Sequence, residues 1–213
     1  MTQLADPDAL VVRLQQLMAR TPADRRAVVG IAGRPGAGKS TLAVALADRL
    51  GPAAVVVGMD GFHLADAVLD QLGLTDRKGV PATFDPDGYR VLLSRLRTEP
   101  GPVYAPGFER TLEQPVAQAI IVHPQHRLVI TEGNYLLLPE PAWTGAREQL
   151  DQVWWLEGDE ALRIERLRQR HVRHGKSPEA ADDWMARVDG PNAEVAARTA
   201  DRADLVVRLD GRV

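Results

Sequence analysis

The segment GRPGAGKST at residues 33–41 constrains the fold of this 213-residue chain more than any other part of it. It matches the pattern G-x-x-x-x-G-K-[ST] at every fixed position. An apolar run at 27–32 precedes it, and the residues up to about 50 have the character of a helix. Glycines let the backbone turn so tightly that successive N–H groups point inward, and the helix N-terminus adds positive charge. The pattern therefore predicts a strand–loop–helix unit that cradles a phosphate.

The chemistry of this loop assigns roles to its last residues. Lys39 would reach the β- and γ-phosphates of a nucleoside triphosphate, and the Ser40 hydroxyl would ligate Mg²⁺. Lys39 is one of only three lysines in a chain whose other basic residues are arginines, so we also expect it to act in catalysis. The predicted phosphate-binding residues of the loop are Gly33, Pro35, Gly36, Ala37, Gly38, Lys39, Ser40 and Thr41.

Composition narrows the class of protein. Hydrophobic residues make up 45% and charged residues 26%, as in ordinary globular domains, and the net charge of −3 gives no basic field to attract nucleic acid. The absence of cysteine excludes disulfides, thiolate metal sites and cysteine catalysis. The first residues lack the features of a signal peptide, and no apolar run approaches the roughly 20 residues that span a bilayer. We therefore expect a cytoplasmic protein with no nucleic-acid or membrane partner.

Strand and helix patterns alternate along the chain. Strands are expected at 27–32, 55–57, 116–122, 127–131, 153–156 and 205–209, and the helices include one opened by Asp6, one by Asp85, one over 159–174 and one opened by Ser177. Such alternation predicts an α/β fold. The expected form has three layers, a parallel five-stranded sheet with helices on both faces. Residues 1–213 would form a single domain.

Two acidic residues follow strands of this sheet. Asp60 comes after the strand at 55–57, and Glu132 ends the strand at 127–131. Ligands of parallel sheets bind at the carboxyl ends of the strands, so both acids should lie beside the phosphate loop. A phosphate cradle, a Mg²⁺ ligand and a carboxylate that takes or orients a proton are the set that phosphoryl transfer requires. As structural alternatives, Asp60 could cap a turn and Glu132 could belong to a buried ion pair.

An ordered set of short motifs follows the loop and makes a family resemblance specific. They are DGFH at 60–63, RKGVP at 77–81, FDP at 84–86, VY at 103–104 and TEG at 131–133, with YAPGFER at 104–110 and DGPN at 189–192. The chain resembles the uridine kinase, pantothenate kinase and phosphoribulokinase family from residue 28 to 207. It is most similar to the bacterial branch labelled fructose-transport-system or nucleoside/nucleotide kinase-like. The resemblance implies a P-loop NTPase three-layer fold with a small β-hairpin insertion and an Arg-rich lid region at about 159–190.

This resemblance implies ATP as phosphoryl donor, Mg²⁺, and a small-molecule acceptor bearing a hydroxyl. Asp60 matches the family's catalytic base, and Glu132 matches the acidic residue that holds Mg²⁺. His63, Tyr104 and Arg110 fall where the family contacts its acceptor. Each could instead be structural: His63 a satisfied histidine, Tyr104 core filling, and Arg110 a surface partner of Glu109.

The Arg-rich helix matches the lid that closes over the triphosphate in the family. Helical spacing places Arg163, Arg166, Arg170 and Arg173 on one face. Guanidinium groups suit phosphate oxygens, so at least one of Arg166, Arg170 and Arg173 is expected to contact phosphate in the closed state. A dense cationic run is more often only a solvated helix face.

The chain also departs from its relatives. Uridine kinases carry a histidine shortly after the tyrosine that matches Tyr104, and the residues at 108–110 include none. The acidic–basic pair Glu109 and Arg110 could instead bind a polyhydroxylated acceptor. The leading hypothesis is an ATP-dependent kinase acting on a hydroxyl of a sugar- or nucleoside-like metabolite, with pantothenate still open. The alternatives are a nucleotide-hydrolysing regulatory switch and an inactive nucleotide-binding regulator. The sequence does not decide whether ATP or GTP is the phosphoryl donor, or whether the chain forms a homodimer.

Overall fold

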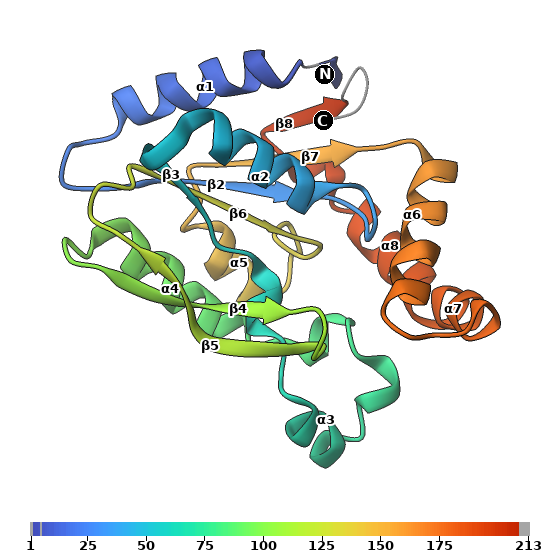
Figure 1. Ribbon diagram of the computed structural model, residues 1–213. Helices are drawn as coiled ribbons and strands as arrows, with labels where there is room; N and C mark the ends of the chain where they lie inside the picture. Colours follow the sequence, from blue (N-terminus) through green and yellow to red (C-terminus); the bar gives the residue numbers. More distant parts are fainter. Residues whose placement is uncertain (1, 5, 209–213) are drawn as a thin grey trace.

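A fully parallel sheet forms the centre of the molecule (Figure 1). The computed structural model describes residues 2–4 and 6–208. The strand order is β1-β8-β7-β2-β6-β3. The bounds are β1 Thr2–Leu4, β2 Ala27–Ala32, β3 Ala54–Val56, β6 Leu128–Gly133, β7 Gln152–Glu157 and β8 Leu205–Arg208. The phosphate-loop strand β2 therefore lies inside the sheet, between β6 and β7.

The predicted α/β class and the parallel sheet are confirmed, and the five strands expected for it are present. The strand count needs a correction, because a sixth strand, β1, adds to the edge next to β8. Three residues are too few to show a periodic pattern, so no local signal predicted this strand. The last residue of the strand expected at 205–209 lies outside the described residues.

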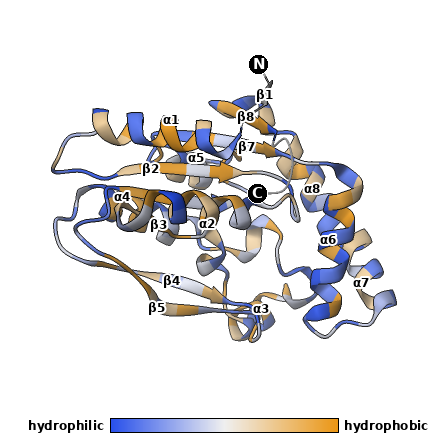
Figure 2. Cartoon of the chain, turned by 45° about the horizontal axis from the view of Figure 1, so that its top comes forward, coloured by the Kyte–Doolittle hydropathy of each residue, from blue (hydrophilic) through white to orange (hydrophobic). Residues whose placement is uncertain are grey.

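Helices cover both faces of the sheet. One face packs against α1 (Pro7–Arg20) and α2 (Lys39–Leu50), and the other against α4 (Pro86–Thr98) and α5 (Pro141–Arg147). The neighbouring residues Trp154 and Trp155 of β7 are buried in the two different cores, because successive strand residues point to opposite faces. Figure 2 shows β2 largely in hydrophobic colours.

A two-stranded hairpin lies apart from the main sheet, on the side of α4 (Figure 1). It consists of β4 (Val103–Glu109) and β5 (Gln114–Val122), antiparallel, with Val103 opposite Val122. This is the expected β-hairpin insertion, but its strands differ from the expected pair. We expected the strand at 116–122 to be joined by a turn to the one at 127–131; instead it pairs backwards with β4, and β6 enters the central sheet. The short helix α3 (Asp66–Leu72) lies nearby.

The predicted lid region, residues 159–190, stands beyond the carboxyl ends of β2 and β7 (Figure 1). It contains α6 (Glu160–Arg173), α7 (Pro178–Trp184) and a π-helix (Met185–Asp189), which continues into α8 (Gly190–Ala197). The side chains of Asp159 and Ser177 accept hydrogen bonds from the first turns of α6 and α7, as their types favour. Much of α6 and α7 is hydrophilic (Figure 2). No helix within residues 6–208 combines the length and apolar character that crossing a membrane needs.

Candidate active site at the carboxyl end of the sheet

The phosphate loop joins β2 to α2 through two glycines with positive φ, Gly36 at +81° and Gly38 at +96°. Only glycine adopts such angles without strain. Space is also restricted, because a Cβ at Gly33 would stand 2.9 Å from the Leu156 carbonyl oxygen. No side chain of the described residues caps the start of α2. The first N–H groups of this helix are therefore free to bind an anion.

Lys39 is buried at the mouth of the loop, with 7% of its surface exposed. Its Nζ donates to the Arg34 carbonyl oxygen at 3.0 Å and to Asn134 Oδ1 at 2.7 Å. Burial lowers the pKa of Lys39 to about 8, although the acids Glu132 and Asp60 act in the opposite direction. A buried ammonium held only by neutral oxygens is suited to bind phosphate.

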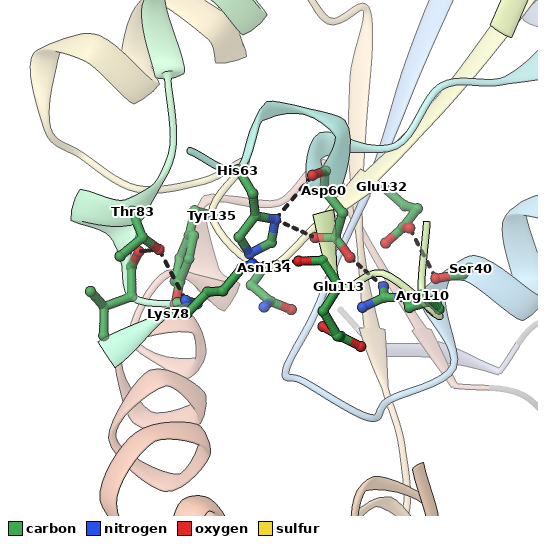
Figure 3. A network of polar contacts seen from close by, with 12 residues as sticks. Ser40, Asp60, His63, Lys78, Thr83, Arg110, Glu113, Glu132, Asn134 and Tyr135 are labelled. Atoms are coloured by element: carbon green, nitrogen blue, oxygen red, sulfur yellow. Dashed lines mark hydrogen bonds and ion pairs between the residues drawn. The ribbon is translucent and has the colours of Figure 1, made fainter. Parts of the chain in front are cut away.

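Ser40 and Glu132 meet next to this ammonium. Ser40 Oγ donates to Glu132 Oε1 at 2.9 Å, which joins the first turn of α2 to the end of β6 (Figure 3). Burial and the nearby Asp60 carboxylate raise the pKa of Glu132. A hydroxyl and a carboxylate are hard oxygen ligands of the type that Mg²⁺ prefers. The described residues contain no group of three His, Cys, Asp or Glu side chains that could hold a metal alone. The pair fits a Mg²⁺ that takes its other ligands from water and phosphate.

Asp60 lies on a 3₁₀ turn, Met59–Phe62, directly after β3. Its carboxylate pairs with Arg110, which comes from the turn between β4 and β5 (Figure 3). Burial alone would raise the pKa of Asp60, but the positive charges of Arg110 and Lys39 outweigh it and the pKa lies below its ordinary value. Asp60 is therefore ionised at neutral pH and can accept a proton or a hydrogen bond.

His63 closes one side of the site. Its ring lies 3.9 Å from that of Phe84 and 4.9 Å from that of Phe108, measured between centroids, and its Nδ1 lies 3.0 Å from the Asp60 carbonyl oxygen. Burial lowers the pKa of His63 despite the Asp60 carboxylate nearby, so the ring is neutral at pH 7. The Arg110 guanidinium stacks over Phe108 at 4.8 Å. Aromatic faces and polar groups thus line the same wall.

These groups open into one cavity of about 370 Å³. The sequence-predicted residues that line it are Pro35, Gly36, Lys39, Ser40, Asp60, His63, Arg110, Glu132 and Arg170. The rest of the wall comes from residues 66–84, from the end of β6, and from the lid region. The loop, the two strand-end acids and one lid arginine are therefore brought together.

Eight predicted residues lie outside this wall: four of the phosphate loop (Gly33, Ala37, Gly38 and Thr41) and four from other elements. The cavity wall, as formed by residues 6–208, does not include Tyr104, Glu109, Arg166 or Arg173. Tyr104 is 51% exposed, because strand alternation buries Val103 and Ala105 and turns Tyr104 outward. Glu109 accepts a hydrogen bond from the Thr111 backbone N–H. The geometry therefore does not support acceptor contacts for Tyr104 and Glu109.

The predicted lid arginines differ among themselves. Arg170 is half-buried in the cavity wall, whereas Arg173 is exposed outside it. Arg166 lies over the loop, with Nη1 3.7 Å from where a Cβ of Gly38 would be. Burial and the neighbouring Arg110 lower the pKa of Arg170. Two of the acids that act on it pair with other residues, Asp60 with Arg110 and Asp189 with His171, and Glu113 is a third acid nearby.

Sequence reasoning missed three contributors. Asn134 accepts a hydrogen bond from Lys39 and follows Glu132 by two residues. A search of the residues just beyond each strand end would therefore have found it. Arg163 is 7% exposed and donates from Nη1 to the Pro35 carbonyl oxygen at 2.9 Å, which braces the loop. No local sequence pattern indicates that Arg163 is buried, because the later arginines of the same helix have similar neighbours in the sequence. Asp189, in the motif DGPN, lines the cavity although no role was assigned to it.

The comparisons with known proteins agree with this geometry. No family model matches the chain. It is 35% identical over 161 residues to "Putative uridine kinase C227.14" of Schizosaccharomyces pombe, covering 71% of this chain and 68% of that protein. It is 35% identical over 191 residues to "Uncharacterized protein YggC" of Escherichia coli K12, covering 87% and 78%.

A crystal structure described as a "putative fructose transport system kinase" from Silicibacter sp. TM1040 superposes with a TM-score of 0.85 at 37% identity, covering 95% of this chain and 98% of that one. Relatives named pantothenate kinase and ATP-dependent kinase also match. The chain therefore belongs to the P-loop kinase family of the uridine and pantothenate kinases and is an ATP-dependent kinase of small molecules.

Proposed function

We propose that this kinase transfers the γ-phosphoryl group of ATP to a hydroxyl of a sugar- or nucleoside-like metabolite, with Asp60 as the catalytic base. The observation that carries the proposal is the meeting of Lys39, Asp60 and the Ser40–Glu132 pair in one cavity. Each comes from a different element at the same edge of the sheet: Lys39 and Ser40 from the start of α2, Asp60 from the turn after β3, and Glu132 from β6.

In this proposal the triphosphate lies along residues 33–41, and Lys39 contacts its β- and γ-phosphates. Asp60 accepts the proton of the acceptor hydroxyl while the hydroxyl oxygen forms a bond to the γ-phosphorus. The bond between that phosphorus and the β–γ bridging oxygen breaks, and its electrons leave with ADP. The products are ADP, a phosphate ester and a protonated Asp60, which returns its proton to water. The lowered pKa of Asp60 keeps it ionised before each turnover.

Ser40 and Glu132 are the residues proposed to hold Mg²⁺, directly or through water. Bound there, the cation would neutralise charge on the β- and γ-phosphate oxygens. Burial and the Asp60 carboxylate raise the pKa of Glu132. Binding a cation would restore the ionised form of this carboxylate.

We assign the lid role to residues 159–190. Arg170 lines the cavity, and two of the acids near it, Asp60 and Asp189, are paired with other groups. Arg166 lies beside Gly38 of the loop, next to the proposed position of the triphosphate. Closure of this region over the nucleotide would exclude water and reduce hydrolysis of ATP.

The proposal is tested by offering the full chain ATP, Mg²⁺ and single acceptors: ribose, fructose, uridine, pantothenate and glycerate. ADP release is measured together with the mass of the phosphorylated product. We expect one class of acceptor to stimulate ADP release in proportion to product. The Lys39→Ala variant should lose both signals, while Arg187→Ala, an exposed pair partner of Asp183, should keep them. ADP release that no acceptor stimulates would refute the proposal.

A further inference from the structure

Asp189 ends a π-helix that separates α7 from α8. π-helical segments are rare, and they occur frequently at functional sites because the extra residue in the turn redirects a side chain. Asp189 is 8% exposed and lies in the wall of the active-site cavity. Although it directly precedes α8, its side chain does not cap that helix. A helix-capping role therefore does not explain this buried acid.

The partner of Asp189 comes from another helix of the lid region. His171 of α6 places Nε2 2.7 Å from Asp189 Oδ2, and both side chains are largely buried. His171 lines the same cavity. Among residues 6–208, the hydrogen bonds of the Asp189 side chain consist of this one contact, and no side-chain oxygen there is both sealed from solvent and unpartnered. The second carboxylate oxygen is therefore reached by solvent, at a residue that lines both the active-site cavity and a neighbouring pocket between α6 and α8.

This wall faces the catalytic wall across Arg170. The negative charges of Asp189, Asp60 and Glu113 all act on the Arg170 guanidinium, so Arg170 lies near all three acids. Nearby, Asn192 Nδ2 donates to the Gly79 carbonyl oxygen at 3.1 Å, and Tyr135 Oη donates to the same oxygen at 2.6 Å. These contacts hold the Asp189 wall against the loop at 79. The cavity therefore has an acid on each side.

A carboxylate without a cationic side chain on its free oxygen accepts hydrogen bonds well and repels anions. Resting on the proposed kinase function, we propose that Asp189, oriented by His171, binds a second hydroxyl of the acceptor. Asp60 takes the hydroxyl that is phosphorylated, and Asp189 selects for another on the same molecule. The acceptor class is then a polyol with at least two hydroxyl groups, and the end that reaches Asp189 carries no negative charge.

The test uses acceptor pairs that differ by one hydroxyl: D-ribose with 2-deoxy-D-ribose, and uridine with 2′-deoxyuridine. Binding to the full chain is measured by calorimetry in the presence of ADP. We expect the wild type to prefer the hydroxylated member of at least one pair by tenfold or more. Asp189→Asn should weaken binding of that member at least tenfold and remove the preference, with ADP affinity and the melting temperature unchanged. Asp182→Asn, at an exposed lid acid paired with Arg168, is the matched control and should bind like the wild type.

The His171→Gln variant tests whether Asp189 binds the acceptor or only links α6 to the π-helix. It removes the imidazole but keeps Asp189, so the preference should shrink and persist. Equal loss for both members of a pair, or a lower melting temperature with the preference intact, would show that Asp189 only fastens α6 to the π-helix. Failure of every pair to bind also overturns the inference. The proposed function fails separately: pairs would bind with Asp189-dependent preference, but the wild type with ATP would yield no phosphorylated product.

Discussion

The two walls of the cavity are built differently. The sheet wall carries Lys39, Ser40, Asp60 and Glu132 on strand and helix ends that pack without spare room: a Cβ at Gly133 would stand 2.6 Å from that of Met59. The lid wall carries Arg170, His171 and Asp189 on helices whose other ties include exposed pairs such as Arg168–Asp182. Exposed pairs contribute little to stability, whereas close backbone packing fixes position.

This difference suggests a division of work. Groups on the sheet wall are held in place before any ligand arrives, as electrostatic stabilisation of a transition state requires. Groups on the lid wall can move with α6 and α7, as closure over a substrate requires. Chemistry would then depend on the sheet wall and selection on the lid wall, and the predictions below probe the two in turn.

The largest effect is expected at the sheet wall. Asp60→Asn should lower kcat by about 10³-fold, because the amide cannot accept the acceptor proton. Nucleotide affinity should stay near the wild-type value, since the loop is untouched. Stopped assays of product and calorimetry with ADP measure the two quantities. Asp87→Asn, on the exposed side of α4, is the control. Near-normal turnover in Asp60→Asn would exclude its role as base.

A smaller loss is expected for the lid. Arg170→Ala should lower kcat by about 10²-fold, the usual size for one donor that stabilises transition-state charge. Arg173→Ala should change kcat less than threefold, because this guanidinium is exposed outside the cavity. Steady-state kinetics of the two variants side by side decide which lid arginine serves the phosphate. The reverse order would mean that α6 rotates by a large angle on closure.

The pH dependence of nucleotide affinity should report the protonation of Lys39. Burial lowers the pKa of the free Lys39 ammonium to about 8, and phosphate nearby would raise it again. Affinity for a non-hydrolysable ATP analogue should therefore be full below pH 8 and fall by up to about tenfold per unit above it. Calorimetry between pH 7 and 9.5 measures this slope, and Lys39→Met should show none. A flat wild-type profile would contradict a buried ammonium that titrates near pH 8.

The smallest effect concerns the exposed tie of the lid region. Removing the Arg168–Asp182 pair with Asp182→Asn should leave the midpoint of unfolding in urea close to that of the wild type, because solvent screens both charges. Urea denaturation followed by circular dichroism measures it. A midpoint well below that of the wild type would mean that the lid region is as firmly fixed as the sheet wall, and the contrast between the two walls would disappear.

The sheet wall was the more predictable of the two. The loop pattern located Lys39 and Ser40, and the rule that strand ends converge located Asp60 and Glu132, because local order along the chain determines both. The hairpin was harder: whether residues 116–122 pair forwards or backwards depends on long-range contacts that no local pattern encodes. The same limit placed Tyr104 in the site, since its outward direction follows from the register of β4 with β5.

For the lid wall, the sequence predicted that arginines would be present but not which of them would reach the cavity. Helical spacing grouped four arginines on one face of α6, but their fates differ: Arg163 braces the loop, Arg170 enters the cavity, and Arg173 is exposed. Those outcomes depend on where α6 lies relative to the loop. The role of Asp189 depends on a π-turn, which hydrophobic periodicity does not indicate.

One carbonyl oxygen limits how this enzyme could be re-engineered. The Gly79 oxygen accepts from Tyr135 of the core and from Asn192 of α8, while Gly79 itself has φ at +106°. Any other residue at 79 would twist the backbone and misdirect both donors together. Grafting the segment around residue 79 from a homologue to change substrate preference would therefore succeed only if the graft keeps this glycine and brings along, or matches, the two side chains fastened to it.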